Sequence, residues 1–452
     1  MSEETRRWKE IFPRPPQAYV LALGAMVFPV MALFAPTQIA ATLLILGAVA
    51  LLLNPVTGFW PLKTQPYLLP LGFLLVLGFL SALWGIDTTD STERAGKLLM
   101  FLAAGTLLLT HARELARPDR TMICWALLNG FAVLLVLFFE ERLTDKWLLR
   151  ELREIDDLKA FAILNQPGVL LALLSWPVAG FLWSIERRGA AALVFVLTPL
   201  SMVGEVGKAG LLAIAVGWVA ALPAMVLPSI TRHVACLCVV VVTVALPVVA
   251  GSSFVLENAY RAMGAESFGE KHRLLMWHFT AGKIAERPLL GWGMDSARVL
   301  PGGDLRVADY AEQKEFAFVG DRTRETFGES VVLQLHPHNM FLQVQLELGF
   351  FGSVALAAFL VLAIRAAMAN GPWMIRGCRM GMLAGAVTAA CISFGVWQSW
   401  WVSSLFLLAV FGAVLPGFQA RERSERDVPE NSVVNPPKDD EENEDDAKGL
   451  YS

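Results

Sequence analysis

Runs of about twenty apolar residues recur along most of the chain, and they limit its possible folds more than any other feature. An α-helix needs about twenty residues to cross the hydrocarbon core of a bilayer, which is about 30 Å thick. Such segments must be helical, because in lipid every backbone amide and carbonyl has to be satisfied within its own segment. With 55% hydrophobic and 17% charged residues, the composition excludes an ordinary soluble globular protein.

The apolar runs predict an all-α, polytopic membrane protein with about twelve transmembrane helices. These helices are expected near residues 18–35, 37–53, 67–85, 97–112, 120–139, 166–184, 189–204, 208–227, 233–250, 340–366, 378–396 and 401–417. The chain then divides into an N-terminal segment (1–17), a transmembrane domain (18–417) and an acidic tail (418–452). The tail cannot bury a core, so we expect it to be disordered.

Lysine and arginine in the short connections predict the orientation of the helices, since they concentrate on the cytoplasmic side. The basic clusters are Arg6, Arg7, Lys9 and Arg14; Lys63; Arg113, Arg117 and Arg120; Arg187 and Arg188; Arg232; Arg365, Arg376 and Arg379; and Arg421 and Arg423. With twelve spans, all of them fall on the same side of the membrane. Both termini are therefore predicted to be cytoplasmic.

The opposite face holds the longest polar segment, residues 251–337, for which we expect ordered structure. Apolar residues at three- and four-residue spacing from Lys271 to Ile284 predict an amphipathic helix in the membrane interface. Trp277 would be its aromatic anchor. The helix should end at Glu286, before Pro288, and Gly291-Trp292-Gly293 predicts a turn.

This segment ends in His336-Pro337-His338-Asn339, directly before a hydrophobic helix. An imidazole at a lipid–water boundary is costly unless it has a partner or a task. His338 could act as a general base toward a hydroxyl, or in its protonated form steady a leaving phosphate. The plain alternative is an interfacial histidine satisfied by a backbone carbonyl. A metal pair with His336, completed by Asp321 and Glu329, is a further alternative, but no His or Cys cluster completes the set and we predict no metal.

Cations on the same face are candidates for binding an anion. Lys208 opens an apolar span, so its ammonium would lie beside free helix amides. Arg273 on the amphipathic helix offers a planar fork that suits phosphate. Arg142, in the charged segment 140–165, is a weaker candidate. For all three, contacts with lipid headgroups or local ion pairs are the alternative.

Tryptophans surround a polar pair in Trp397-Gln398-Ser399-Trp400-Trp401, between the last two predicted spans. An aromatic belt at the membrane surface would explain the stretch. Stacking of Trp397 and Trp401 on sugar rings, with Gln398 binding a hydroxyl, explains it equally well.

One spacing is more specific than these features. His338-Asn339 is followed, after nine residues, by Gly349-x-x-Gly352. This pattern resembles the signature of the O-antigen ligase and O-antigen polymerase family of bacterial inner-membrane proteins. The stretch Arg273–Trp277, leading to Pro288–Gly293, is similar to that family as well, and the Trp-rich stretch resembles its ligase branch. We also expect the two glycines to let another helix pack closely.

The resemblance implies a membrane glycosyltransferase without cofactor or metal. It would move a glycan from undecaprenyl pyrophosphate to a lipid A–core sugar hydroxyl at the periplasmic face, with membrane lipids and no nucleic acid as further partners. His338 and Arg273 would be catalytic. The residues expected near the pyrophosphate are Lys208, Arg273, Arg142, His336 and Asn339, and those expected near the acceptor sugar are Trp397, Gln398 and Trp401.

Three other functions remain as alternatives. An O-antigen polymerase and a protein O-oligosaccharyltransferase differ from a ligase mainly in their acceptor. A transporter of lipid-linked glycans would be a different class, and it predicts ionisable residues at mid-membrane and broken helices in matched halves. The sequence has few charges at the centres of its predicted spans and no internal repeat, so transport is the weaker hypothesis.

Overall fold

The computed structural model describes residues 14–57, 65–153, 164–203, 208–264, 267–320, 326–369 and 371–415. All of them lie in one unit, Met1–Phe418. The predicted tail lies outside the described residues, as do Lys63 and Asp321.

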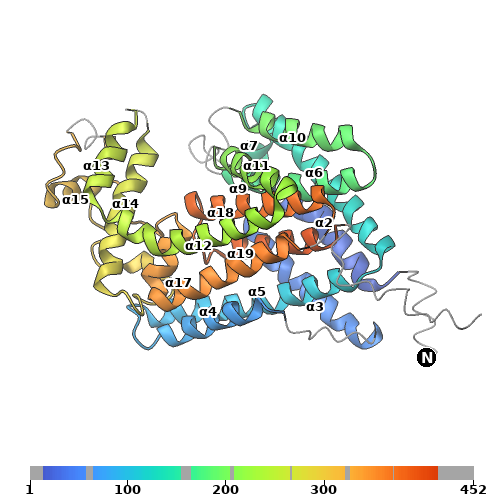
Figure 1. The fold of residues 1–452 in the computed structure, drawn as a ribbon, viewed down its shortest axis with the longest axis horizontal. Coiled ribbons are helices and arrows are strands. Elements are labelled where there is room, and N and C mark those ends of the chain that lie inside the picture. The colour runs from blue at the N-terminus through green and yellow to red at the C-terminus, as the bar shows by residue number, and fades with distance from the viewer. Residues whose placement is uncertain are drawn as a thin grey trace, which may run out of the picture. The chain divides into compact units, whose positions relative to one another are not determined.

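The described residues form helices and no strand, apart from one isolated bridge between Arg306 and Val331 (Figure 1). The helices are α2 (Pro16–Phe34), α3 (Ile39–Thr57), α4 (Leu68–Ser81), α5 (Thr88–Glu114), α6 (Arg117–Leu143), α7 (Trp147–Arg153), α9 (Asn165–Ser184), α10 (Arg188–Met202), α11 (Lys208–Val226), α12 (Pro228–Ala250), α13 (Ser253–Ala262), α14 (Phe268–Glu286), α15 (Val307–Gln313), α17 (Met340–Ala367), α18 (Trp373–Ile392) and α19 (Ser399–Ala413), with short 3-10 helices η1 (Pro36–Gln38) and η2 (Ser296–Val299).

Nine of the described helices are long and apolar enough to cross a membrane, and α4, α10 and α19 are shorter apolar helices. The prediction of an all-α, polytopic membrane protein is confirmed. The count of twelve spans and their orientation stay predictions.

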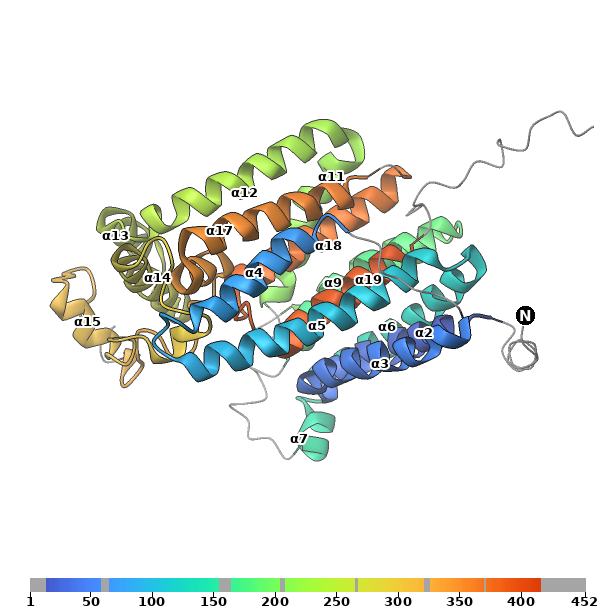
Figure 2. The ribbon, with the colours of Figure 1, turned by 90° about the horizontal axis from the view of Figure 1, so that it is seen from below.

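The long helices lie along one another, and α13, α14 and α15 gather beyond the ends of α12 and α17 (Figures 1 and 2). We call this the histidine end, because α17 begins there directly after His338. The opposite end is called the arginine end. Arg113 lies in the last turn of α5, Arg365 in the last turn of α17, and Arg379 in the first half of α18.

Two large hydrophobic cores follow from this arrangement, beside a small one around Ala224 and Ile364. One consists of the apolar faces of the long helices. The other lies at the histidine end and joins α13, α14 and α15 to Leu342 and Leu346 of α17. The predicted amphipathic helix is present as α14 and ends at Glu286 as expected. Its Trp277 donates from Nε1 to the Pro337 carbonyl over 2.8 Å, so the indole contacts the histidine segment, and its role as an interface anchor stays a prediction.

Helix α17 is kinked at Gly349, whose φ is 63°. The segment Pro288–Gly293 crosses α17 at this point. Phe350 donates its N–H to the Pro288 carbonyl over 2.9 Å, while Trp292 and Gly293 donate to the Leu346 and Glu347 carbonyls, each over 2.9 Å. The crossing segment therefore satisfies the backbone groups that the kink leaves open, as a buried backbone requires.

This crossing corrects one expectation. The glycine pair Gly349 and Gly352 was expected to admit a neighbouring helix. Instead, Gly349 admits a turn segment, since a Cβ there would collide with the Leu289 carbonyl. A Cβ at Gly352 would meet Leu348 of its own helix.

The substitution Gly349→Ala tests the crossing. It adds strain at a positive φ and a collision with backbone, so we expect a loss of at least about 2 kcal/mol in the free energy of unfolding. Gly282→Ala in α14 is the control, since a Cβ there has no atom within 4 Å. Thermal unfolding of both purified variants measures the difference, and equal melting temperatures would contradict the role given to Gly349.

Candidate active site

The histidine segment is held in place by the cap of α17. Asn339 is the N-cap residue, and its Oδ1 accepts from the N–H groups of Phe341 and Leu342 over 3.1 and 3.2 Å. Its side chain is buried and occupied by the cap. Its predicted contact with a pyrophosphate stays a prediction, and the cap uses only the oxygen of its amide. Directly before it, His338 adopts a left-handed conformation with φ 50°, a strained geometry for a residue other than glycine and one that is common at functional sites.

His338 has one defined tautomer. Its Nδ1 lies 2.7 Å from the carbonyl oxygen of Ser393. A carbonyl only accepts, so Nδ1 carries the proton and Nε2 of the neutral ring keeps its lone pair. Among the described residues, Nε2 has no hydrogen-bond partner. The alternative of an interfacial histidine satisfied by a backbone carbonyl requires such a carbonyl, and it is present. The same hydrogen bond also fixes the direction in which Nε2 points.

His336 lies directly against His338 and helps to hold it in place. It is 5% exposed, and the centroid of its ring lies 4.2 Å from that of His338. Its Nδ1 accepts the backbone N–H of His338 over 3.2 Å, and its Nε2 lies 3.2 Å from the Gln398 side-chain amide. A Cβ at Gly395 would approach the His336 ring to 2.8 Å, so only glycine fits there.

Both imidazoles are neutral near pH 7. Burial is the main cause that lowers the pKa of His336, to about 3, and His338 and Arg298 add to it. Burial also lowers the pKa of His338 from 6.5, against the opposing effect of the Ser393 carbonyl, and Arg273 and His272 lower it further. A neutral His338 is the form that can take a proton.

Two guanidinium groups thus lie within electrostatic reach of the histidine pair. Arg273, on α14, acts on His338, and Arg298, on η2, acts on His336. Arg298 also pairs through Nε with Asp295 over 3.3 Å. The sequence analysis missed Arg298. Its signal would have been its place five residues after Gly293, in the glycine turn that crosses α17.

Lys208 lies exposed at the first position of α11. The position of Lys208 along the bundle follows from the packing of α11 on α18. A Cβ at Gly217 would lie 2.9 Å from the Gly381 carbonyl, and a Cβ at Gly385 would lie 2.9 Å from the Ala213 carbonyl. The two helices are antiparallel in this register. Lys208 is therefore level with the last turn of α18, at the histidine end.

Arg142 makes a contact within the protein, and its predicted contact with phosphate stays a prediction. Its Nη1 donates to the Leu200 carbonyl over 2.6 Å, in the last turn of α10. A cation at a helix C-terminus satisfies a carbonyl that has no partner within the helix. The structure thus gives Arg142 a part in joining α6 to α10 and no contact with the histidine pair.

A fully buried carboxylate links the parts of the site. Glu347 is 0% exposed and accepts from Nε1 of Trp397 over 2.5 Å, from the N–H of Asp295 over 2.6 Å and from Nε2 of Gln343 over 3.1 Å. Gln343 in turn accepts the N–H of Val396 over 2.9 Å. Helix α17 therefore fixes the turn 393–398, which carries the Ser393 carbonyl and Gly395.

A second link runs through Asp295. Arg94 of α5 pairs with its carboxylate over 2.7 Å and also donates from Nη1 to the Trp397 carbonyl over 3.3 Å. The side chains of Arg94 and Asp295 are 17% and 6% exposed, so the pair is shielded from water. The Asp295 carboxylate also pairs with Arg298, and it thereby orients the Arg298 guanidinium.

The Trp-rich stretch lies inside the protein. Trp401 is 1% exposed and packs on Phe394 with ring centroids 4.9 Å apart. It also lines the apolar cavity described below, and its predicted contact with a sugar stays a prediction. Trp397 is 8% exposed and bound to Glu347. Gln398 contacts His336, so it is the one of the three predicted acceptor residues that adjoins the histidine pair.

The alternative metal pair finds no further ligands in the described part of the chain. No group of three or more His, Cys, Asp or Glu side chains there is arranged to hold a metal ion. Glu329, one of the suggested ligands, pairs with Arg306 over 3.5 Å, and Asp321 lies outside the described residues.

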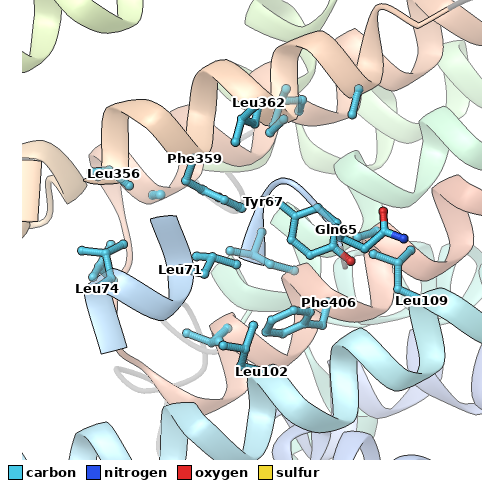
Figure 3. A pocket seen from close by; sticks show the side chains of 18 of the residues that line it. Gln65, Tyr67, Leu71, Leu74, Leu102, Leu109, Leu356, Phe359, Leu362 and Phe406 are labelled. Carbon is cyan, nitrogen blue, oxygen red and sulfur yellow. The ribbon is translucent and has the colours of Figure 1, made fainter. Parts of the chain in front are cut away.

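An apolar cavity of about 720 Å³ starts beside this site. Met294, Met340, Val396 and Trp397 line it at the histidine end. It continues between α4, α5, α17, α18 and α19, where Leu71, Leu102, Phe359 and Phe406 point into it (Figure 3).

Comparison with known proteins agrees with the resemblance in the sequence. Residues 191–357 match the model of a family described as O-antigen ligase. A protein of Rickettsia conorii that carries the provisional name polysaccharide ligase is 23% identical over 328 residues, which are 72% of this chain and 74% of the relative. A protein of Rickettsia prowazekii with the same provisional name is 25% identical over 331 residues, 72% of this chain and 75% of the relative. The predicted resemblance to this family is confirmed.

The substitution Glu347→Gln tests the buried carboxylate. An amide nitrogen would replace one of two acceptor oxygens and face a donor, so we expect a loss of about 1–3 kcal/mol in the free energy of unfolding. Glu257→Gln, which removes an exposed ion pair with Arg261 on α13, is the control and should change the melting temperature little. A Glu347 variant as stable as this control would contradict the role of the carboxylate.

Proposed function

We propose that this chain, whose residues 191–357 match the O-antigen ligase family, joins a polysaccharide to an acceptor at a bacterial inner membrane. The donor is a glycan on undecaprenyl pyrophosphate, and the acceptor is a sugar hydroxyl of lipid A–core. The reaction takes place at the periplasmic face, which in this proposal is the histidine end of the bundle.

The observation that carries the proposal is the tautomer of His338. The Ser393 carbonyl holds Nδ1–H, so Nε2 is left as a base. The lowered pKa keeps that nitrogen unprotonated at neutral pH, which is the state required to accept a proton from a hydroxyl.

The proposed step is a direct transfer. The acceptor oxygen attacks the anomeric carbon of the donor sugar while its proton passes to Nε2 of His338. The bond between that carbon and the pyrophosphate oxygen breaks, and the electron pair leaves with the pyrophosphate. Since pyrophosphate is already a good leaving group, the site mainly has to hold its charge and position the hydroxyl.

Arg273 and Arg298 supply the positive charge for the leaving group. They act on the two imidazoles from different elements, α14 and η2, so a pyrophosphate bound next to His338 would lie near both. A guanidinium fork binds phosphate oxygens in pairs. Lys208 lies level with this end of the bundle and adds a third cation to the same face.

A metal ion is not needed in this proposal, because the arginines take the role of neutralising the pyrophosphate. Activity should therefore persist in the presence of a chelator. Product that depends on an added divalent cation would contradict this part of the proposal.

The substitution His338→Ala should reduce transfer of glycan from undecaprenyl pyrophosphate to lipid A–core by about 10²–10⁴-fold, since it removes the base. The assay uses the full-length protein in detergent with chelator present. His233→Ala is the matched control, because His233 is exposed on α12 and binds the Ser229 carbonyl of its own helix. Equal loss in both variants would contradict the role of His338, and lengthening of the glycan without lipid A–core would favour a polymerase.

The pH profile tests the position of Arg273. In the wild type, activity should stay high as pH falls through 6.5 and decline only at lower pH, because the pKa of His338 is lowered. Arg273→Gln removes a charge that lowers this pKa, so the decline should begin at higher pH, and KM for the donor should rise. Arg306→Gln, an exposed arginine paired with Asp309, should leave the profile unchanged. If the pH profile of Arg273→Gln were the same as that of the wild type, Arg273 would not influence the pKa of His338, which would contradict the position given to Arg273.

A further inference from the structure

The Asp295 carboxylate lies between two guanidinium groups that hold it unequally. Arg94 of α5 donates to Oδ2 from Nε over 3.0 Å and from Nη2 over 2.7 Å. Arg298 reaches the carboxylate with Nε alone, which lies 3.3 Å from both Oδ1 and Oδ2. Hydrogen bonds between charged nitrogen and oxygen atoms are usually about 2.7–2.9 Å long. Arg94 is therefore the main partner of Asp295, and Arg298 is the weaker one.

The weaker partner keeps both terminal nitrogens of its guanidinium. Within the described part of the chain, Nη1 and Nη2 of Arg298 donate no hydrogen bond. All three guanidinium nitrogens of Arg94, in contrast, are bound within the protein. The Arg298 side chain is also the most accessible of the three, at 33% exposed, against 17% for Arg94 and 6% for Asp295. Since two terminal N–H groups can bind two oxygens of one phosphate, Arg298 has the cationic group that suits a pyrophosphate.

The loop that carries Asp295 is held in place by bonds that do not involve Arg94. Ser91 of α5 donates from Oγ to the Met294 carbonyl over 2.7 Å, and Ser81 of α4 accepts the Met294 N–H over 3.0 Å. These three residues are fully buried. The backbone next to Asp295 is thus attached to α4 and α5 by two hydroxyl groups. What Arg94 adds at this position is mainly a positive charge beside a buried carboxylate.

A structural role of Arg94 is the alternative, because its Nη1 also donates to the Trp397 carbonyl over 3.3 Å. The turn that contains Trp397 has other bonds, however. Glu347 accepts from the Trp397 indole, and Gln343 accepts the Val396 N–H over 2.9 Å. The structural alternative predicts that any loss of the Arg94 guanidinium disturbs the site. A role through charge predicts that the loss is compensated when the Asp295 carboxylate is removed as well.

Loss of the Arg94 charge would change the surroundings of Arg298. Asp295 would remain as a buried carboxylate, and Arg298 would be its remaining ion-pair partner among the described residues. A buried charge without a partner is costly, and attraction between charges is stronger where water is excluded. We expect Arg298 to turn its terminal nitrogens toward the carboxylate, since a two-pronged pair is the more stable arrangement. The same nitrogens could then not bind a phosphate.

We propose that Arg94 is a positioning residue for the donor: it neutralises Asp295 and thereby leaves the Arg298 guanidinium free to bind the pyrophosphate. Arg94 acts through Asp295 and does not touch the substrate. The proposal rests on the proposed function, which places the pyrophosphate near Arg298. It adds that the affinity for the donor depends on a residue of α5 that lies 201 residues before Asp295 in the chain.

The first test removes the charge of Arg94. In Arg94→Gln, KM for undecaprenyl-pyrophosphate glycan and the inhibition constant of inorganic pyrophosphate should each rise by about tenfold, since one charged contact with phosphate is lost. Arg94→Lys retains the charge, so both constants should stay within about threefold of the wild type. Initial rates are measured on the full-length protein in detergent, with lipid A–core at saturation.

The second test also removes the carboxylate. In Arg94→Gln/Asp295→Asn, Arg298 has no acidic partner, so both constants should return to within about threefold of the wild type. Asparagine suits the position, because Asp295 has a φ of 61° and asparagine tolerates this region better than most residues. If Arg94→Gln does not fold, the double variant decides alone, since a structural role of Arg94 predicts raised constants in it.

Arg261→Gln is the matched control, because it removes an equal charge from an exposed side chain of α13 at the same end of the bundle. Both constants should be unchanged in it. Thermal stabilisation by inorganic pyrophosphate is a readout that needs no glycan transfer, and it should be smaller in Arg94→Gln than in the wild type or the double variant. If the wild type transferred no glycan, the proposed function would fail, and this stabilisation would still test the charge of Arg94.

Five outcomes would overturn the proposal. Unchanged constants in Arg94→Gln would mean that Asp295 does not compete for Arg298. Constants as high in the double variant as in Arg94→Gln would assign Arg94 a structural role, and so would equally high constants in Arg94→Lys. An equal effect of Arg261→Gln would indicate a general attraction of anions to this end of the bundle. A wild type that pyrophosphate neither inhibits nor stabilises would have no anion site at Arg298.

Discussion

The exchange of backbone hydrogen bonds between α17 and the segment Pro288–Gly293 underlies the rest of the structure at the histidine end. A helix broken inside a membrane protein leaves amides and carbonyls open, and each costs several kcal/mol if it stays unpaired. Here the Pro288 carbonyl accepts from the Phe350 N–H, and the Trp292 N–H donates to the Leu346 carbonyl. The break is therefore tolerated, and it fixes the loop that carries Asp295 and Arg298.

Side chains then extend this connection to the histidines. The Glu347 carboxylate holds the Asp295 amide and the Trp397 indole together, and Gln343 holds the Val396 amide. Through these bonds α17 positions the turn 393–398, whose Ser393 carbonyl sets the tautomer of His338. A helix rather than a loop thus determines where the basic nitrogen points, and rigid support of this kind favours a preorganised site.

The sequence predicted what depends on local pattern. The apolar runs predicted a set of helices long enough to cross a membrane. The spacing of His338, Gly349 and Gly352 indicated the family. Glu347 and Arg298 were not found, because their roles come from partners about 50 and 38 residues away, at Trp397 and His336, which no periodicity reveals. The same reason explains why the burial of Trp401 and the crossing at Gly349 were not predicted. An aromatic pattern does not distinguish a buried Trp401 from one at the surface, and a glycine pair does not tell whether a helix or a turn segment crosses it.

The kink at Gly349 also has a consequence for biogenesis. Pro288–Gly293 precedes α17 in the chain, so it has left the ribosome before Gly349 is made. The Leu346 and Glu347 carbonyls receive their hydrogen bonds from this segment and not from α17 itself. The kinked form of α17 and the docked form of the segment therefore depend on each other. A chain in which the segment has not docked lacks the bonds that hold the kink, and with them the support for the geometry that aims the imidazole.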